Sequence, residues 1–211
     1  SKTANVPTDY PFEDFKDIML KYFVNNFEKY NNFLQKRMDM NGEHKTPEFL
    51  QKNPLGRVPV LETDEGEFLT EAIAICRYLE ALYPEPNLFG KNANDVGQIE
   101  MHHSQIEADL WFQVRSSWKN GPVLEKMGYK VAPEAKVFSD ASVYAYYEKL
   151  NNELSDKEYL AASRFTIADI ILLVCVDFAI HYCGLKPDES LQNLWRWHGF
   201  ITSRESVGAI S

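Results

Sequence analysis

Residues 165–170 read Phe-Thr-Ile-Ala-Asp-Ile, which is the clearest structural signal in the chain. A threonine followed three residues later by an acidic residue is typical of a capping box, in which each side chain bonds the other residue's backbone amide. The Phe165 ring can pack on Ile170 as a hydrophobic staple. The pattern predicts a helix that begins at Thr166 and runs to about Tyr182. Its apolar residues lie nearly all round, which predicts a central place in an α-helical domain.

Helical periodicity also dominates the sequence on both sides of this segment. It predicts further helices over residues 96–118, 136–154 and 191–203. Upstream, the segment Tyr83–Gly90 holds two prolines within three residues, through which a helix does not continue. We therefore expect an α/β domain over residues 1–83, a linker over 84–91 and an all-α domain over 92–211.

The region before the two prolines mixes strand and helix patterns. The expected elements are strands over 2–6 and 32–40, helices over 12–27 and 46–52, two strands at 58–61 and 67–69 that flank a turn, and a helix over 71–82 capped by Thr70.

Composition excludes several classes of function. Lys and Arg total 22 against 31 Asp and Glu, and the formal charge of -9 repels a phosphate backbone, so nucleic acid is not an expected partner. The longest apolar run, Ile170–Val176, is far shorter than the roughly 20 residues of a membrane span. Residues 1–12 show no signal-peptide pattern and the three cysteines show no CxxC spacing, so a reducing, cytoplasmic location is expected.

Several segments together resemble soluble glutathione S-transferases, especially bacterial and phi-like forms. They are Gly42–Leu50, Asn53–Glu62, Leu69–Leu79 and the capping box Phe165–Asp169. The resemblance covers about residues 38–205, in the order and at the spacing of that family, whereas the first 37 residues match poorly. It implies an N-terminal thioredoxin-like βαβ-ββα domain followed by an all-helical C-terminal domain.

The same residues suit the binding of a peptide thiol. A cis bond between Val58 and Pro59 would turn the Val58 N–H and C=O toward solvent, where an extended peptide such as glutathione can pair with them. The first amides of a helix that opens at Glu71-Ala72 can receive a carboxylate. The resemblance implies that this carboxylate is the γ-glutamyl one. It further implies that three basic residues hold the rest of the peptide: His44 and Lys45 the glycyl carboxylate, and Arg57 the backbone.

Each feature also has a plain structural interpretation, namely an edge proline, a helix cap and solvated surface charges. Their joint occurrence favours the binding site. Ala72 departs from the family, which usually has Ser or Thr there, and costs one hydroxyl hydrogen bond to the ligand.

The family places a thiolate-stabilising donor just after the first strand. Pro7-Thr8-Asp9-Tyr10-Pro11 puts Tyr10 at that position, with Thr8 as the second candidate. A hydrogen bond from either group to the sulfur would favour the thiolate over the thiol. The alternative is that Tyr10 only packs against the first helix.

The second substrate of such an enzyme is expected to be an apolar electrophile. The first long helix of the α-domain carries His103 and Trp111 as candidate pocket residues, although aromatic residues on such a helix also serve as core or dimer contacts. A metal is not expected, because the adjacent His102 and His103 point about 100° apart and no ligand spacing completes a site. The cysteines lie away from the predicted thiol site, which disfavours thiol–disulfide exchange.

The resulting hypothesis is a cytoplasmic, homodimeric glutathione transferase that conjugates glutathione, its co-substrate, to apolar electrophiles in detoxification. Two alternatives remain open. One is a non-catalytic binding or assembly protein of the same fold; the other is a glutathione-dependent dehalogenase, isomerase or peroxidase.

Overall fold

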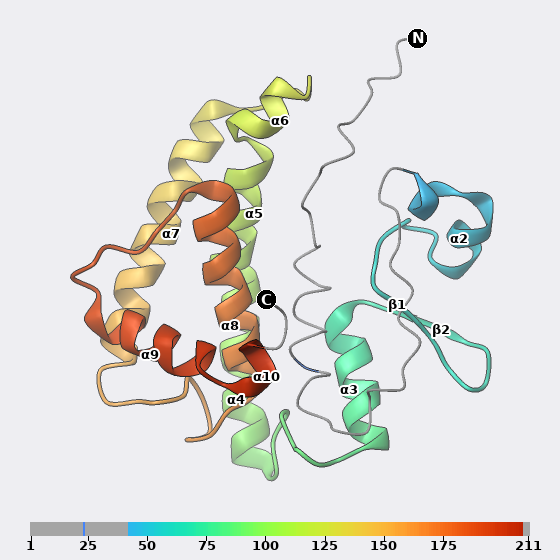
Figure 1. Ribbon diagram of the computed structural model, residues 1–211, viewed down its shortest axis with the longest axis horizontal. Coiled ribbons are helices and arrows are strands. Elements are labelled where there is room, and N and C mark those ends of the chain that lie inside the picture. Colours follow the sequence, from blue (N-terminus) through green and yellow to red (C-terminus); the bar gives the residue numbers. More distant parts are fainter. Residues whose placement is uncertain (1–22, 24–41, 209–211) are drawn as a thin grey trace. The chain divides into compact units, whose positions relative to one another are not determined.

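The computed structural model describes Phe23 and residues 42–208 (Figure 1). The boundary between two compact units falls between Pro86 and Asn87, inside the predicted linker. The strands predicted at 2–6 and 32–40 lie outside the described residues, and so do Thr8 and Tyr10. Of the helix predicted over 12–27, Phe23 is described, and it is helical and fully buried.

The first unit holds a short helix, a hairpin and a longer helix in the predicted order. The 3-10 helix η2 (Glu43–Lys45) precedes α2 (Pro47–Lys52), β1 (Val60–Glu62) pairs antiparallel with β2 (Phe68–Thr70), and α3 (Ala72–Leu82) follows. Helix α2 begins one residue later than predicted, because Thr46 is its N-cap: the Thr46 hydroxyl accepts a hydrogen bond from the Phe49 amide at 3.3 Å.

The predicted start of α3 is wrong by one residue. Thr70 is the last residue of β2 and its backbone pairs with Val60 in the sheet. Its side chain therefore does not cap the helix. Glu71 is the N-cap, with φ 67° and ψ 117°, and Ala72 is the first helical residue. The first strand of the hairpin, β1, begins at Val60 and not at the predicted Val58, because Pro59 has no N–H to donate to a sheet.

The second unit is helical throughout its regular structure. Helix α4 (Ala93–Gln105), the π-helical segment η3 (Ile106–Trp111) and α5 (Phe112–Lys119) form one continuous helix where 96–118 was predicted, and α7 (Pro133–Glu153) packs along α5 (Figure 1). Then follow α8 (Ile167–Phe178), the π-helical η4 (Ala179–Cys183) and α9 (Gln192–Thr202). The short helices α6 (Pro122–Lys126) and α10 (Glu205–Gly208) were not predicted.

Over the stretch from residue 42 to residue 208, none of the helices has both the length and the apolar character that crossing a bilayer requires.

The capping box predicted at the start of α8 is confirmed. The Thr166 amide donates to Asp169 Oδ2 at 3.0 Å, and the reciprocal bond from the Asp169 amide to the Thr166 side chain is also present. Within α8 every residue except Asp177 is buried, which confirms its central position. The Asp169 carboxylate also accepts from the Leu160 amide at 2.8 Å and from Trp197 Nε1 at 3.1 Å. It therefore joins α8 to the preceding loop and to α9.

Burial makes the stability of this unit depend on pH. Desolvation raises the pKa of Asp169 to about 6, against the lowering effect of its hydrogen bonds. The native state then holds a proton that the unfolded chain has already lost, so the free energy of unfolding should fall by about 3 kcal/mol as the pH rises from about 4 to 6. Urea unfolding across that range measures the effect. The Asp169→Asn variant, which does not titrate there, should lack this component, and parallel pH profiles for the two proteins would contradict the prediction.

Candidate functional site

The hairpin brings together two of the segments predicted to bind a peptide. Because β1 and β2 are antiparallel and Val60 pairs with Thr70, the residues just before β1 and just after β2 lie at the same end of the ladder. These residues are Val58 and Pro59 on one strand and Glu71 and Ala72 on the other. All four belong to the first unit.

At this end, the Val58 backbone has no hydrogen-bond partner within the described residues. Its side chain is buried, with the whole residue 8% exposed, and its peptide bond to Pro59 is cis. Within the described part of the chain, no residue forms a hydrogen bond with the Val58 N–H or C=O. An extended peptide laid alongside could pair with both groups, as an added strand does at a sheet edge.

The first turn of α3 supplies donors beside this edge. The first hydrogen bond within α3 runs from the Ile75 amide to the Glu71 carbonyl at 3.0 Å. The amides of Ala72, Ile73 and Ala74 come before it and therefore have no acceptor within the helix. Such amides carry the positive end of the helix dipole and favour an anion. Glu71 reaches this position with a positive φ, a conformation that is costly for a residue with a Cβ and is often found at binding sites.

The basic residues differ in where the structure places them. Lys45 is exposed, and its ammonium group donates to the Gly56 carbonyl at 3.0 Å and reaches the Leu55 carbonyl at 3.5 Å, so it lies across the loop that leads to Val58. His44, next to it, is half-buried, and Arg57 is exposed within the same loop. The structure thus gathers Lys45 and Arg57 at the approach to the Val58 backbone.

Sequence reasoning missed the two residues that shape this loop, Asn53 and Gly56. Asn53 follows directly on the helix predicted over 46–52 and is only 3% exposed, and an asparagine before a loop is a known hydrogen-bonding signal. Gly56 has φ 58°, in the left-handed region that favours glycine.

Replacing Gly56 by alanine should therefore destabilise the first unit. A Cβ there would lie 2.6 Å from Lys45 Nζ and 2.9 Å from the His44 carbonyl oxygen. Strain and displacement together should lower the free energy of unfolding by about 1 to 3 kcal/mol. Gly66→Ala is the matched control, since Gly66 has φ 80° with open space around it and so carries the conformational cost alone. If the two variants lost equal amounts of unfolding free energy in urea, a clash of the added Cβ with Lys45 and His44 would not contribute to the effect.

The residues proposed for the second substrate lie in the other unit. His103 is half-buried in α4, and its Nδ1 lies 3.3 Å from Glu100 Oε1. Trp111, at the end of η3, packs edge-on against Phe178 with ring centroids 5.3 Å apart. No hydrogen bond or ring contact joins His103 to Trp111 among the described residues, so their common role as a pocket stays a prediction.

All three cysteines lie in described segments. Cys76 and Cys175 are buried, and Cys183 is partly buried. Burial raises the pKa of each thiol above its ordinary value, that of Cys183 to about 11. Between residues 42 and 208, no three His, Cys, Asp or Glu side chains are arranged to hold a metal ion.

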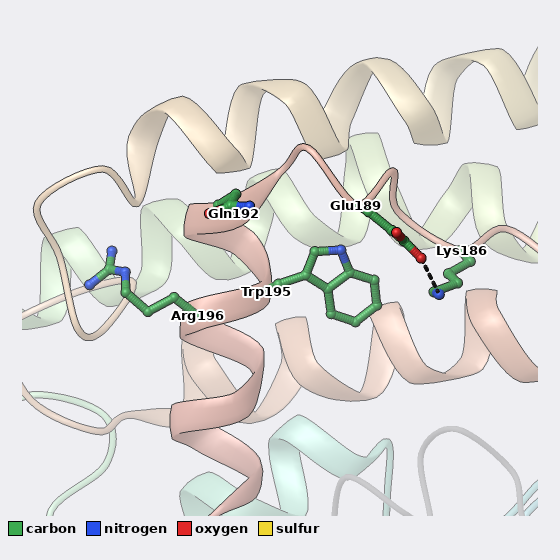
Figure 2. Close-up of a pocket in the computed structure, with 5 residues that line it drawn as sticks. All are labelled: Lys186, Glu189, Gln192, Trp195 and Arg196. Atoms are coloured by element: carbon green, nitrogen blue, oxygen red, sulfur yellow. Dashed lines mark ion pairs between the residues drawn. The ribbon is translucent and has the colours of Figure 1, made fainter.

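A shallow pocket of about 540 Å³ opens at the start of α9 (Figure 2). Its lining residues are Lys186, Glu189, Gln192, Trp195 and Arg196. Three of these side chains bond within the protein: Lys186 pairs with Glu189 at 3.5 Å, and Trp195 Nε1 donates to the Asp188 carbonyl at 3.1 Å. None of the predicted site residues lines this pocket.

Comparison with known proteins identifies the family. Residues 20–81 match the glutathione S-transferase N-terminal domain and residues 123–205 the glutathione S-transferase C-terminal domain, so the chain belongs to the glutathione S-transferase family. It is 32% identical over 171 residues to glutathione S-transferase 2 of Saccharomyces cerevisiae, covering 79% of this chain and 72% of that protein.

Two further relatives bear on fold and function. A glutathione S-transferase domain-containing protein of Marinobacter aquaeolei has a crystal structure that matches with a TM-score of 0.83 and 26% identity, over 92% of this chain and 96% of that one. Elongation factor 1-gamma 3 of rice (Oryza sativa subsp. japonica) is 35% identical over 145 residues, which cover 66% of this chain but only 32% of the factor. The predicted fold, a thioredoxin-like domain followed by a helical domain, is confirmed.

Proposed function

We propose that this protein is a glutathione transferase that joins the sulfur of glutathione to apolar electrophiles. The observation that carries the proposal is the Val58 backbone, whose N–H and C=O have no partner among the described residues, beside the first turn of α3 at one end of the hairpin. A peptide edge and an anion receptor placed together suit a short peptide with a carboxylate at its end. Membership of the family supplies the identity of that peptide.

Each residue at the site then has a role in holding glutathione. The Val58 N–H and C=O pair with the peptide backbone, and the amides at Glu71-Ala72 receive the γ-glutamyl carboxylate. Lys45, with His44, attracts the glycyl carboxylate, and Arg57 lies along the backbone. Ala72 offers an amide but no hydroxyl, so affinity should be several-fold lower than with a serine there.

The chemical step needs a thiolate and a partner held close to it. Tyr10, or Thr8 in its place, would donate a hydrogen bond to the sulfur and lower the pKa of the thiol toward the working pH. His103 and Trp111 would line the pocket for the electrophile. The rate gain would come from thiolate stabilisation and from positioning. We place this enzyme in the cytoplasm as a homodimer with a detoxifying role.

Titration with glutathione in a calorimeter at neutral pH tests the binding half of the proposal. A Kd between micromolar and low millimolar is expected, followed by conjugation of glutathione to a chlorodinitrobenzene as the probe electrophile. No heat of binding and no thermal stabilisation by millimolar glutathione would overturn the proposed function.

The second candidate is a non-catalytic binding or assembly role. The similarity to rice elongation factor 1-gamma 3 and the alanine at position 72 favour it. Glutathione binding without conjugation would support this role. It would equally call for tests of dehalogenase, isomerase and peroxidase activity, which share the thiol site and differ in the second pocket.

A further inference from the structure

The buried side chain of Asn53 forms hydrogen bonds through both its Nδ2 and its Oδ1 in the loop before Val58. Its Nδ2 donates to the Arg57 carbonyl at 2.7 Å, and its Oδ1 accepts from the Leu55 amide at 3.0 Å. Its backbone carbonyl accepts from the Gly56 amide at 2.8 Å, and its own amide caps α2 through the Phe49 carbonyl at 2.9 Å. One residue thus ties the end of α2 to three successive residues of the loop.

The bond to the Arg57 carbonyl acts directly on the Val58 amide. Arg57 C=O and Val58 N–H belong to one planar trans peptide group, so they point in opposite directions. Asn53 approaches the carbonyl from the interior, because it is only 3% exposed. The Val58 N–H therefore points away from Asn53, and fixing one end of the plane fixes the other.

The same bond also strengthens the donor. A carbonyl that accepts a short hydrogen bond polarises its peptide group, and the N–H at the far end becomes a better donor. Lys45 holds the next peptide upstream through the Gly56 carbonyl at 3.0 Å, so adjacent peptide planes are held by two separate side chains.

We propose that Asn53 is a positioning residue for glutathione: it orients and polarises the Arg57–Val58 peptide so that the Val58 N–H meets the ligand backbone. It does not touch the ligand. This inference rests on the proposed function, and it adds a determinant of affinity that lies behind the binding surface.

The Asn53→Asp variant tests this role. The change keeps the shape and the acceptor oxygen facing the Leu55 amide, but it replaces the donor by a negatively charged oxygen next to the Arg57 carbonyl, which should turn the peptide plane. The Kd for glutathione should rise about tenfold, equivalent to about 1.4 kcal/mol. With the chlorodinitrobenzene, KM for glutathione should rise by the same factor, while kcat at saturating glutathione stays within about twofold, because the sulfur is activated elsewhere.

Asn120→Asp is the matched control in the second unit. Asn120 Nδ2 donates to the Ser116 carbonyl at 2.9 Å, and its Oδ1 accepts from the Ala132 amide at 2.8 Å, so the same kind of donor is lost. Its glutathione Kd should equal that of the parent, whatever its melting temperature. If Asn53→Asp does not fold, Asn53→Ala takes its place in the same comparison.

The outcomes separate the two proposals. A parent protein that does not bind glutathione overturns the proposed function and this inference with it. A parent that binds, with an Asn53 variant that binds equally well, overturns this inference alone. Equal weakening by the Asn53 and Asn120 variants also overturns it, because the effect would then be one of general stability.

Discussion

Replacing Asp169 by alanine is expected to lower the free energy of unfolding by about 4 kcal/mol at neutral pH, the largest stability effect that we predict. The reason is the number of buried donors that would lose their acceptor. The amides of Leu160 and Thr166 and the Trp197 indole N–H all bond to this carboxylate, and Asp169, Leu160, Thr166 and Trp197 are each at most 1% exposed. Urea unfolding of the parent and the variant measures the difference.

The control for this variant is Asp188→Ala. Asp188 also accepts two hydrogen bonds, from the amide and the hydroxyl of Ser190, but it lies exposed between η4 and α9. Water can replace its bonds, so its loss should be far smaller than that of Asp169. Similar losses for the two variants would show that burial of the Asp169 network is not what stabilises the unit.

The Tyr10→Phe variant should conjugate glutathione to the chlorodinitrobenzene at least about tenfold more slowly, a barrier higher by about 1.4 kcal/mol. Its Kd for glutathione should not change, because the role proposed for the hydroxyl is a hydrogen bond to the sulfur and not to the groups that hold the peptide. Pre-steady-state or saturating kinetics together with calorimetry separate the two quantities.

Tyr129→Phe, which removes a hydroxyl from a tyrosine that is 57% exposed, is the control and should behave as the parent. A Tyr10→Phe rate equal to that of the parent would remove Tyr10 from the mechanism. The Thr8→Val variant would then be the next to measure.

Local signals predicted the elements whose ends are marked by side chains. Helix α2 could be placed because Thr46 caps it and Asn53-Pro54 ends it, and α8 because Thr166 and Asp169 bond each other's amides. Four residues with turn propensity, Thr63–Gly66, separated the two strands of the hairpin correctly. In each case the two residues that form the deciding interaction are only a few positions apart, so both can be recognised in one short stretch of sequence.

Features that depend on distant partners could not be predicted in this way. Sheet pairing with Val60 moved the N-cap of α3 from Thr70 to Glu71 and its first helical residue from Glu71 to Ala72. The π-helical turns of η3 and η4 carry no local sequence signal. The candidate site shows the same division. The motif around Val58 pointed to a peptide edge, whereas the hold of Asn53 on the Arg57 carbonyl emerged only from the folded loop.

The raised pKa values of the three cysteine thiols, two of them buried and one partly buried, have a consequence for their reaction with disulfides. Thiolates are the species that attack disulfides, oxidised glutathione among them. With the pKa of Cys76, Cys175 and Cys183 raised, hardly any of these groups is ionised at neutral pH. The chain should therefore resist glutathionylation even in a buffer that contains oxidised glutathione.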